Sequence, residues 1–369
     1  MRNKLQKKYL LILLLPFGYL LNLLSRTSST VTEAVYSNGL YRGISWLIGN
    51  LWGWLPFSVM ELLFPVLMLI ALWRIAVWIG RLIRDREKRW AVFRKGIMDA
   101  LLVVSIAYFL FIALWGLNYN RRNLADILDL EVRPSTLEEL VEMTEELLEK
   151  TNKLREKVQE DEDGITVLDG GPEGAFARAG KGYLAAADYI PGICKVYGRP
   201  KPLIFSSAIA YTHIWGIYSP FTGEPNINTK IPAPMLPSTM MHEFAHQIGF
   251  AREDEANYIS YLTCSYHPDA DFRYSGSLHA LNYSMNAVYS QNPEAWKDLY
   301  NKLSDGIKRD LAENAKYHAK YAGPVREALT KTNDAYLKAN NQKDGERSYG
   351  RMVDLLLAQY RYEKENTKR

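Results

Sequence analysis

The chain has 369 residues, enough for more than one structural unit, and its 48% hydrophobic and 23% charged residues resemble those of an ordinary soluble protein. These averages conceal a division, because the apolar residues are concentrated in the first third and the chain is polar from Tyr119 onward. The net charge of +4 excludes little by itself, but it does not indicate a nucleic-acid partner, since much of the basic excess lies beside the apolar segments, where it is typical of membrane topology.

Two cysteines, Cys194 and Cys264, are present. Two thiols are too few for a disulfide framework or for a thiolate metal site. A single bridge and two separate buried thiols are both compatible with the sequence.

Three stretches are apolar enough to cross a bilayer, which takes roughly 17–25 residues. They are residues 9–24, 55–79 and 97–117. The first is short and could be a secretory signal peptide, but Ser25-Arg26-Thr27 offers no small-x-small cleavage site. We therefore expect an uncleaved anchor, residues 1–117 with three transmembrane helices, followed by a soluble domain, residues 118–369.

The basic residues predict the orientation in the bilayer. Between the first and second spans the chain has only Arg26 and Arg42, whereas the loop after the second span carries seven basic residues: Arg81, Arg84, Arg86, Lys88, Arg89, Arg94 and Lys95. Loops rich in Lys and Arg remain in the cytoplasm. This predicts a multi-pass cell-membrane protein with a cytoplasmic N-terminus and an extracytoplasmic C-terminal domain.

Two features of the anchor are less regular. Glu61 and Arg74 lie in the second span, each within about two turns of an end, so both side chains are expected to snorkel to the interface. Residues 41–54 are rich in Trp and Gly, and we expect them to lie along the outer interface as an amphipathic element.

The soluble domain is predicted to be mainly α-helical. Residues 135–138, Ser-Thr-Leu-Glu, have the pattern of a capping box, and leucines at helical spacing follow them. Residues 174–187 are expected to form a helix and residues 200–207 a strand. Residues 211–231 mix aromatic residues with turn formers, which suggests short strands joined by a tight turn.

A further helix is expected to begin near Ser238, because prolines at 232, 234 and 237 disfavour helix before it and serine is a good N-cap. Helices separated by short breaks then extend to about Tyr362. The predicted fold class is therefore mainly α: three N-terminal transmembrane helices and one helical domain with a small sheet.

The helix near Ser238 carries His242-Glu243-Phe244-Ala245-His246. Two histidines four residues apart project from one face of a helix, one turn apart, and both ring nitrogens can reach a single Zn²⁺ at about 2.0–2.1 Å. Glu243 is rotated off that face and can reach a water at the metal instead. The spacing predicts His242 and His246 as metal ligands and Glu243 as the catalytic base, although ordinary hydrogen bonds could also satisfy these side chains.

A catalytic zinc site needs a third protein ligand and an open position. Gly249 can end the helix as its C′ residue, and position 252, where a third histidine would lie in one zinc family, is an arginine. The sequence after it resembles the gluzincin metallopeptidases, in which a glutamate on the next helix binds zinc and is followed four residues later by Asp or Asn.

Glu253 and Asn257 match that gluzincin spacing. The resemblance implies a zincin-like fold, Glu253 as the third ligand, and Asn257 as a hydrogen-bond partner of a ligand histidine. Glu255 is the alternative ligand, and a solvated acidic helix start is the alternative explanation of the whole run. The gap between His246 and Glu253 is shorter than in the better-known gluzincins, so the two helices must be joined by a tight turn.

The order of spans, basic loop and zinc motif also resembles a bacterial membrane family known as domain of unknown function 3810. That similarity would cover most of the chain, and it implies no substrate.

Residues 216–224 precede the metal helix. In gluzincins an edge strand there pairs with an extended peptide substrate, but an ordinary packing segment is equally compatible with the sequence. Tyr218 or His213 could donate a hydrogen bond to the oxyanion of the tetrahedral intermediate. Three lone histidines are expected at the surface or in packing: His267, His279 and His318.

The sequence thus leads us to expect a membrane-anchored zinc metallopeptidase that hydrolyses peptide or protein substrates with a metal-activated water. A non-catalytic scaffold or sensor with a structural zinc site is the main alternative. An intramembrane protease is disfavoured because the motif lies far beyond the last span among prolines and charges, and a zinc hydrolase acting on cell-wall peptides remains open.

Overall fold

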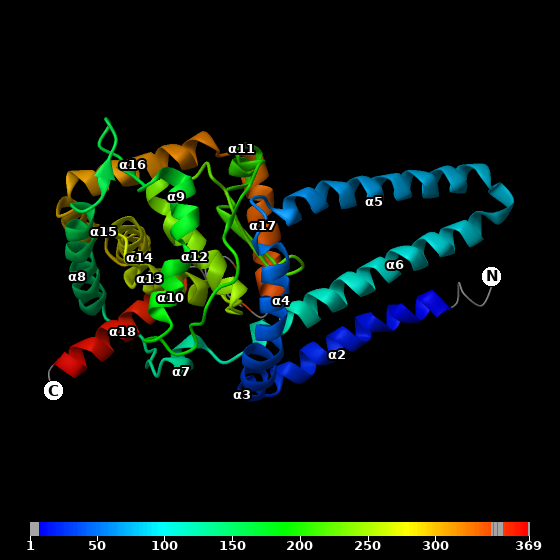
Figure 1. Ribbon diagram of the computed structural model, residues 1–369, viewed down its shortest axis with the longest axis horizontal. Coiled ribbons are helices and arrows are strands. Elements are labelled where there is room, and N and C mark those ends of the chain that lie inside the picture. The colour runs from blue at the N-terminus through cyan, green and yellow to red at the C-terminus, as the bar shows by residue number, and fades with distance from the viewer. Residues whose placement is uncertain (1–6, 341, 343–344, 346–349, 368–369) are drawn as a thin grey trace.

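The computed structural model describes residues 7–340, 342, 345 and 350–367. Three long apolar helices extend from one side of a soluble part, which is built mostly of shorter helices (Figure 1). The described residues also form two small sheets. The mainly α fold class is confirmed.

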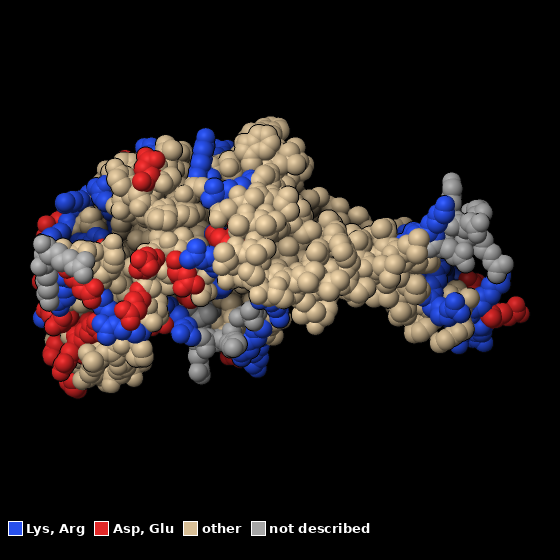
Figure 2. All heavy atoms as spheres, turned by 90° about the horizontal axis from the view of Figure 1, so that it is seen from below, with Lys and Arg blue, Asp and Glu red and all other residues tan. Residues whose placement is uncertain are grey.

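The three helices are long and apolar enough to cross a membrane, and they span Tyr9–Arg26, Val59–Arg84 and Arg86–Leu114. The first two predicted spans are confirmed to within five residues, whereas the third helix begins eleven residues earlier than expected, at Arg86, and ends three residues earlier, at Leu114. Between the basic tip of the second and third helices and the soluble part, the surface in Figure 2 is a continuous band of uncharged residues. In secondary structure the spans comprise η1 (Tyr9–Leu13) with α2 (Leu14–Arg26), α5 (Val59–Arg84), and η3 (Arg86–Lys88) with α6 (Arg89–Leu114).

Helix α2 packs along α6, with the rings of Phe17 and Phe109 stacked at 5.8 Å and Gly18 against Tyr108. Helix α5 starts at Val59, four residues later than expected, because Ser58 accepts the backbone N–H of Glu61 at 3.0 Å and caps the helix there.

The chain between the first and second spans forms α3 (Ser29–Val31), η2 (Thr32–Leu40) and α4 (Tyr41–Gly53). Figure 1 shows α4 running across the ends of the spans, next to the soluble part. Its buried residues recur every four positions, at Tyr41, Ser45 and Gly49. Its other face exposes large apolar side chains, including Trp46, Leu47 and Leu51. The two-faced helix expected here is confirmed.

The soluble part follows η4 (Gly116–Asn120). Its helices are α7 (Leu124–Ile127), α8 (Leu137–Arg155), α9 (Gly171–Arg178), α10 (Gly180–Ala186), α11 (Ser206–Ile209), η5 (Ala210–Thr212), η6 (Ala233–Met235), α12 (Leu236–Gln247), α13 (Glu253–Ser265), α14 (Ala270–Gln291), α15 (Pro293–Asn301), α16 (Asp305–Lys320), α17 (Pro324–Ala339) and α18 (Met352–Thr367).

Two helix starts differ from expectation by a few residues. Thr136, not Ser135, caps α8 by accepting the N–H of Glu139. The helix expected over 174–187 is divided into α9 and α10 and begins earlier, at Gly171, because Pro172 fits the first turn of a helix.

The larger sheet has the order β3-β5-β4, so β4 is an edge strand. Its strands are β3 (Lys201–Pro202), β4 (Gly216–Ser219) and β5 (Glu224–Ile227), with β4 and β5 antiparallel. The predicted pair of short strands joined by a tight turn is confirmed, and Gly223 adopts φ +65° in that turn. The strand expected over 200–207 is shortened to β3 because α11 begins at Ser206. A second sheet pairs β1 (Gln159–Glu160) with β2 (Thr166–Val167).

Helix α12 lies at the centre of the core, and His242 is its one residue that is not fully buried. The helix begins at Leu236 rather than at Ser238, so the predicted cap is wrong. Pro237 is accommodated within the first turn, where its missing N–H has no helical partner. The hydroxyl of Ser238 instead donates to the carbonyl oxygen of Met235 at 3.0 Å.

Candidate metal centre

The tight turn between α12 and α13 brings three predicted ligands together. Helix α12 ends at Gln247, and Gly249 follows with φ +92°, a conformation that residues with a side chain rarely adopt. The backbone N–H of Gly249 donates to the carbonyl of His246 at 3.0 Å, and α13 begins only four residues later at Glu253. Glu253 therefore faces the two histidines of α12.

The distances among the three side chains match a tetrahedral metal site. The Nε2 atoms of His242 and His246 are 3.1 Å apart. Oε2 of Glu253 lies 3.2 Å from the first and 3.6 Å from the second. A tetrahedral zinc ion with bonds of about 2.0–2.1 Å holds its ligand atoms about 3.3–3.4 Å apart. The three residues thus fit a zinc ion with little movement.

The other ring nitrogens determine which atoms of the histidines face the centre. Nδ1 of His242 lies 2.8 Å from Oδ1 of Asn257, and Nδ1 of His246 lies 2.7 Å from the carbonyl oxygen of Phe250. Both partners are acceptors, so each Nδ1 carries the hydrogen and each neutral ring presents its Nε2 lone pair to the centre. Two lone pairs and a carboxylate oxygen converge, an arrangement that a shared cation stabilises.

The pKa values of two of the predicted ligands, His246 and Glu253, reflect the same convergence. Burial disfavours the charged form of His246, but the Glu253 carboxylate outweighs it and raises the pKa of His246 to about 9. Burial likewise works against the ionised Glu253, yet the two imidazoles lower the pKa of Glu253 to about 2. The centre therefore attracts positive charge, either as a proton on His246 or as a metal ion that replaces that proton.

Glu243 lies between the metal helix and the edge strand β4. It is 4% exposed, and burial raises the pKa of its carboxyl group. The carboxylate accepts the backbone N–H of Tyr218. A Cβ atom at Gly216 would lie 2.5 Å from Oε1 of Glu243, so this close approach of the strand requires glycine. The second oxygen, Oε2, is buried and has no hydrogen-bond partner in the part of the chain that the structure describes.

Glu255, the alternative ligand, points away from the centre. Its Oε1 accepts the backbone N–H of Leu124 at 2.8 Å and the guanidinium of Arg252 at 2.7 Å. Glu253 is therefore the carboxylate that the fold places beside the histidines.

His279 and Tyr283 of α14 lie beside the centre, whereas the sequence led us to expect His279 at the surface or in packing and did not single out Tyr283. Nε2 of His279 lies 3.3 Å from Oδ1 of Asn257, and the two aromatic rings are 5.0 Å apart. Burial, with the nearby His242, lowers the pKa of His279 to about 3. Tyr283 also hydrogen-bonds Asn257. Their spacing of four residues, which places them on one face of α14, was the only sequence signal.

The two candidates for an oxyanion donor lie in different surroundings. The hydroxyl of Tyr218 is 3.2 Å from that of Tyr41, and its ring is 5.8 Å from that of Trp115. His213 instead pairs with His318, with their Nδ1 atoms 3.0 Å apart, and its Nε2 donates to the carbonyl of Tyr321. His318 thus has a packing role, as expected.

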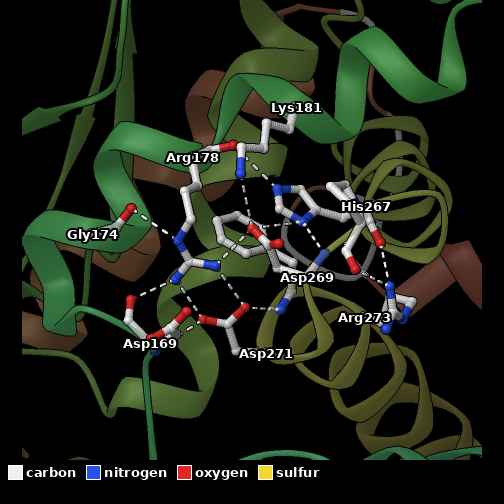
Figure 3. Close-up of polar contacts among 10 residues, drawn as sticks. Asp169, Gly174, Arg178, Lys181, His267, Asp269, Asp271 and Arg273 are labelled. Carbon is white, nitrogen blue, oxygen red and sulfur yellow. Dashed lines mark hydrogen bonds and ion pairs between the residues drawn. The ribbon is translucent and has the colours of Figure 1, made fainter.

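His267 also has a packing role, just after the C-terminal end of α13. It is 1% exposed and stacks on Phe272 with the ring centroids 3.8 Å apart. Figure 3 shows the polar network around it, in which the Arg178 guanidinium donates to Asp269 at 2.9 Å and to Asp271 at 2.7 Å. This network joins α9 to the loop that follows α13 and to the first turn of α14. Cys194 and Cys264 are both free thiols.

The anchor contacts the metal helix directly, although these residues are far apart in the chain. The indole Nε1 of Trp115 donates to the carbonyl oxygen of His246 at 3.1 Å, and the Trp115 and His246 rings meet edge to face at 6.0 Å. The hydroxyl groups of Tyr41 and Ser45 donate to the carbonyl oxygen of Gln247 at 2.9 and 2.8 Å. Residues on both sides of position 117 therefore build the surroundings of the centre.

The second span is bonded to the soluble part at its N-terminus. Glu61 is buried, and its two oxygens each accept a backbone N–H at 2.7 Å, from Ile204 and Phe205. The expectation that Glu61 snorkels to water is therefore wrong, because the soluble part covers the end of this helix.

The chain matches the family described as "Protein of unknown function (DUF3810)" over residues 36–357. This range includes two of the three spans and all the residues of the candidate centre, so the chain belongs to that family. No curated protein and no solved structure matches the chain.

Proposed function

We propose that this member of the DUF3810 family is a membrane-anchored zinc peptidase that hydrolyses peptide bonds with an activated water molecule. The observation that carries the proposal is the set of three distances among His242, His246 and Glu253, which fits a tetrahedral ion, with the Glu243 carboxylate on the same helix beside it. Zinc, when bound, supplies a Lewis acid that polarises the scissile carbonyl and lowers the pKa of water.

The residues of the chain supply the proton transfers. Glu243 accepts a proton from water as the water oxygen bonds to the carbonyl carbon, and returns it to the leaving nitrogen as the C–N bond breaks. Burial raises the pKa of Glu243, which suits a group that must both take and give a proton near neutral pH. Its Oε2 is buried without a hydrogen-bond partner among the described residues, so it remains able to accept that proton.

The edge strand β4 supports a peptide as the substrate. An extended chain can add to an edge strand through main-chain hydrogen bonds, and β4 is held against Glu243 by the N–H of Tyr218. A peptide added to this edge would place its main chain beside the catalytic carboxylate.

A non-catalytic scaffold with structural zinc is the alternative. Structural zinc sites are usually closed by four protein ligands. Within the described residues, the group able to hold a metal contains three. An incomplete protein shell favours the catalytic proposal, because it leaves a position for water.

The test uses the full-length protein in detergent, since anchor residues contact the metal helix. Bound zinc is measured by mass spectrometry, and a degenerate peptide library is offered with and without chelator. Hydrolysis that chelation abolishes and zinc restores supports the proposal. Stoichiometric zinc without any hydrolysis would favour the scaffold.

A further inference from the structure

Two elements flank the candidate centre, and each of them is hydrogen-bonded to the end of a membrane span. We call these two elements the walls of the centre. The first wall is α12, whose ligand His246 accepts a hydrogen bond from Trp115, the residue directly after the third span ends at Leu114. The first residue after the apolar helix therefore already contacts the metal helix.

The second wall is the β4–β5 hairpin, which is bonded to the start of the second span. Glu224 accepts the backbone N–H of Val59 on one carboxylate oxygen and that of Met60 on the other, each at 3.0 Å. These are the first two residues of α5, so Glu224 caps the positive end of a membrane helix. Glu224 also pairs directly with Ser219 at the end of β4.

Helix α4 defines the level of the membrane surface between these two points. It crosses the ends of the spans (Figure 1), and two hydroxyl groups on its inner face donate hydrogen bonds to the carbonyl oxygen of Gln247. Its outer face exposes Trp46 and Leu47 by 54% and 60%, and Trp54 follows with 75%. Trp and Leu on one face of a helix that lies across span ends are typical of the lipid headgroup layer.

The depth of the centre follows from these contacts. The headgroup layer on each side of a bilayer is roughly 5–8 Å thick. The ring of the ligand His246 lies 6.0 Å from that of Trp115, which is at the end of a span. A peptide bond held between β4 and α12 would therefore lie at or just above the headgroups.

We propose that the substrates are polypeptides tethered to the same membrane, cut close to the point where they leave the bilayer on the side of the soluble part. This inference rests on the proposed peptidase function and adds the class of substrate. A tether raises the effective concentration of the scissile segment to about the millimolar range. An extended chain advances about 3.3–3.6 Å per residue, so cuts are expected within roughly the first ten residues after the substrate's own span.

The functional test uses full-length protein and a reporter in the same vesicles. The reporter is a single transmembrane helix followed by a 40-residue polar linker of randomised sequence, which gives roughly 130 Å of reach when extended. The matched control is the same linker without the helix, free in solution at equal total concentration. Cut positions are counted by mass spectrometry.

We expect the tethered linker to be cut at least tenfold faster, with cuts clustered next to the helix. Equal rates on the free linker, or cuts spread evenly along the tethered one, would overturn the membrane-substrate inference and leave the peptidase proposal intact. If the zinc-loaded protein cuts neither, the peptidase proposal fails as well.

The position of the centre has its own test that needs no turnover. In a Cys194→Ser background, a fluorophore is attached at Ile217→Cys on the edge strand β4 or, as the control, at Lys297→Cys on α15, an exposed residue on the side of the soluble part away from the spans (Figure 1). Lipids with a nitroxide on the headgroup should quench the first label strongly and the second weakly. Equal quenching of the two labels would place the centre away from the bilayer and overturn the inference.

Discussion

The Oδ1 atom of Asn257 lies 2.8 Å from Nδ1 of His242, so a residue on α13 fixes the ring of a proposed ligand on α12. The same oxygen is 3.3 Å from Nε2 of His279, and Tyr283 also bonds this asparagine. Three helices thus meet at one amide, which holds the His242 tautomer whose Nε2 faces His246 and Glu253. We therefore expect the affinity for zinc to depend on the side-chain amide of Asn257.

Asn257→Ala is expected to weaken zinc binding by about 10- to 100-fold, because the histidine loses the acceptor that fixes its tautomer and orientation. Titration against a competing chelator measures the change. Asn257→Asp keeps an acceptor oxygen and should lose less affinity than the alanine variant. Equal affinity in wild type and Asn257→Ala would show that the amide does not position the ligand.

Glu243→Gln is expected to retain zinc and to lose peptide hydrolysis by at least about 10²-fold, the usual range for a general base. The amide preserves the shape of the side chain but accepts no proton. Glu149→Gln, the same change at an exposed position of α8, is the matched control and should leave both properties unaltered. Hydrolysis that survives in Glu243→Gln would remove this residue from the mechanism.

The variants Glu253→Gln and Glu255→Gln should show which of the two glutamates is the third metal ligand. The first is expected to lose most bound zinc, since a neutral amide replaces the carboxylate that lies 3.2 Å from His242. The second should keep zinc and lose thermal stability, because Leu124 and Arg252 lose a charged acceptor. Metal content and melting temperature are measured for both variants. The reverse result would make Glu255 the ligand.

The stability of the folded protein should fall as the pH drops from about 6.5 to about 4, in part through His267. Burial lowers the pKa of this histidine to about 4, despite the hydrogen bond to the Arg178 carbonyl and the nearby Asp269 and Asp271. The unfolded chain, with a histidine pKa of about 6.5, therefore binds the proton first, and the contribution present above pH 6.5 is lost as the pH falls. The full effect is about 3 kcal/mol.

Denaturation of the full-length protein at a series of pH values measures this loss. His267→Gln removes the titrating ring and should give a shallower decline between pH 6.5 and 4, although its stability at neutral pH is lower. An unchanged slope in that variant would assign the acid sensitivity to other groups.

The features that the sequence predicted correctly depend on short-range patterns. The spans follow from long apolar runs, and the convergence of the His242, His246 and Glu253 side chains follows from the four-residue spacing of the histidines together with the turn at Gly249. The i, i+4 relation of Glu253 and Asn257 places both on the face of α13 that meets α12. The β4–β5 pair follows from turn-forming residues between two short strand segments. Local chemistry alone determines each of these.

The features that were missed or wrong depend on contacts between residues distant in the chain. Glu61 looked like a charge near a helix end, but its partners Ile204 and Phe205 lie more than 140 residues later. His279 looked isolated because its neighbour is on another helix. Serine is a residue type that often caps a helix, but Ser238 lies inside α12. Its backbone N–H donates to Ser275 of α14, and packing against α14 lets the helix begin before Pro237. No periodicity in the sequence encodes such pairings.

The close contact between α4 and the soluble part has a consequence for any truncated version of the protein. The Cα atoms of Gly53 and Gly198 leave no room for side chains between them, and Tyr41, Ser45 and Trp115 supply the donors for the carbonyls of the last two residues of α12. A fragment that starts at residue 118 would expose these surfaces to solvent and lose the donors. Melting should therefore be a single cooperative transition for the anchored chain, whereas the excised fragment should be poorly ordered around the ligand turn.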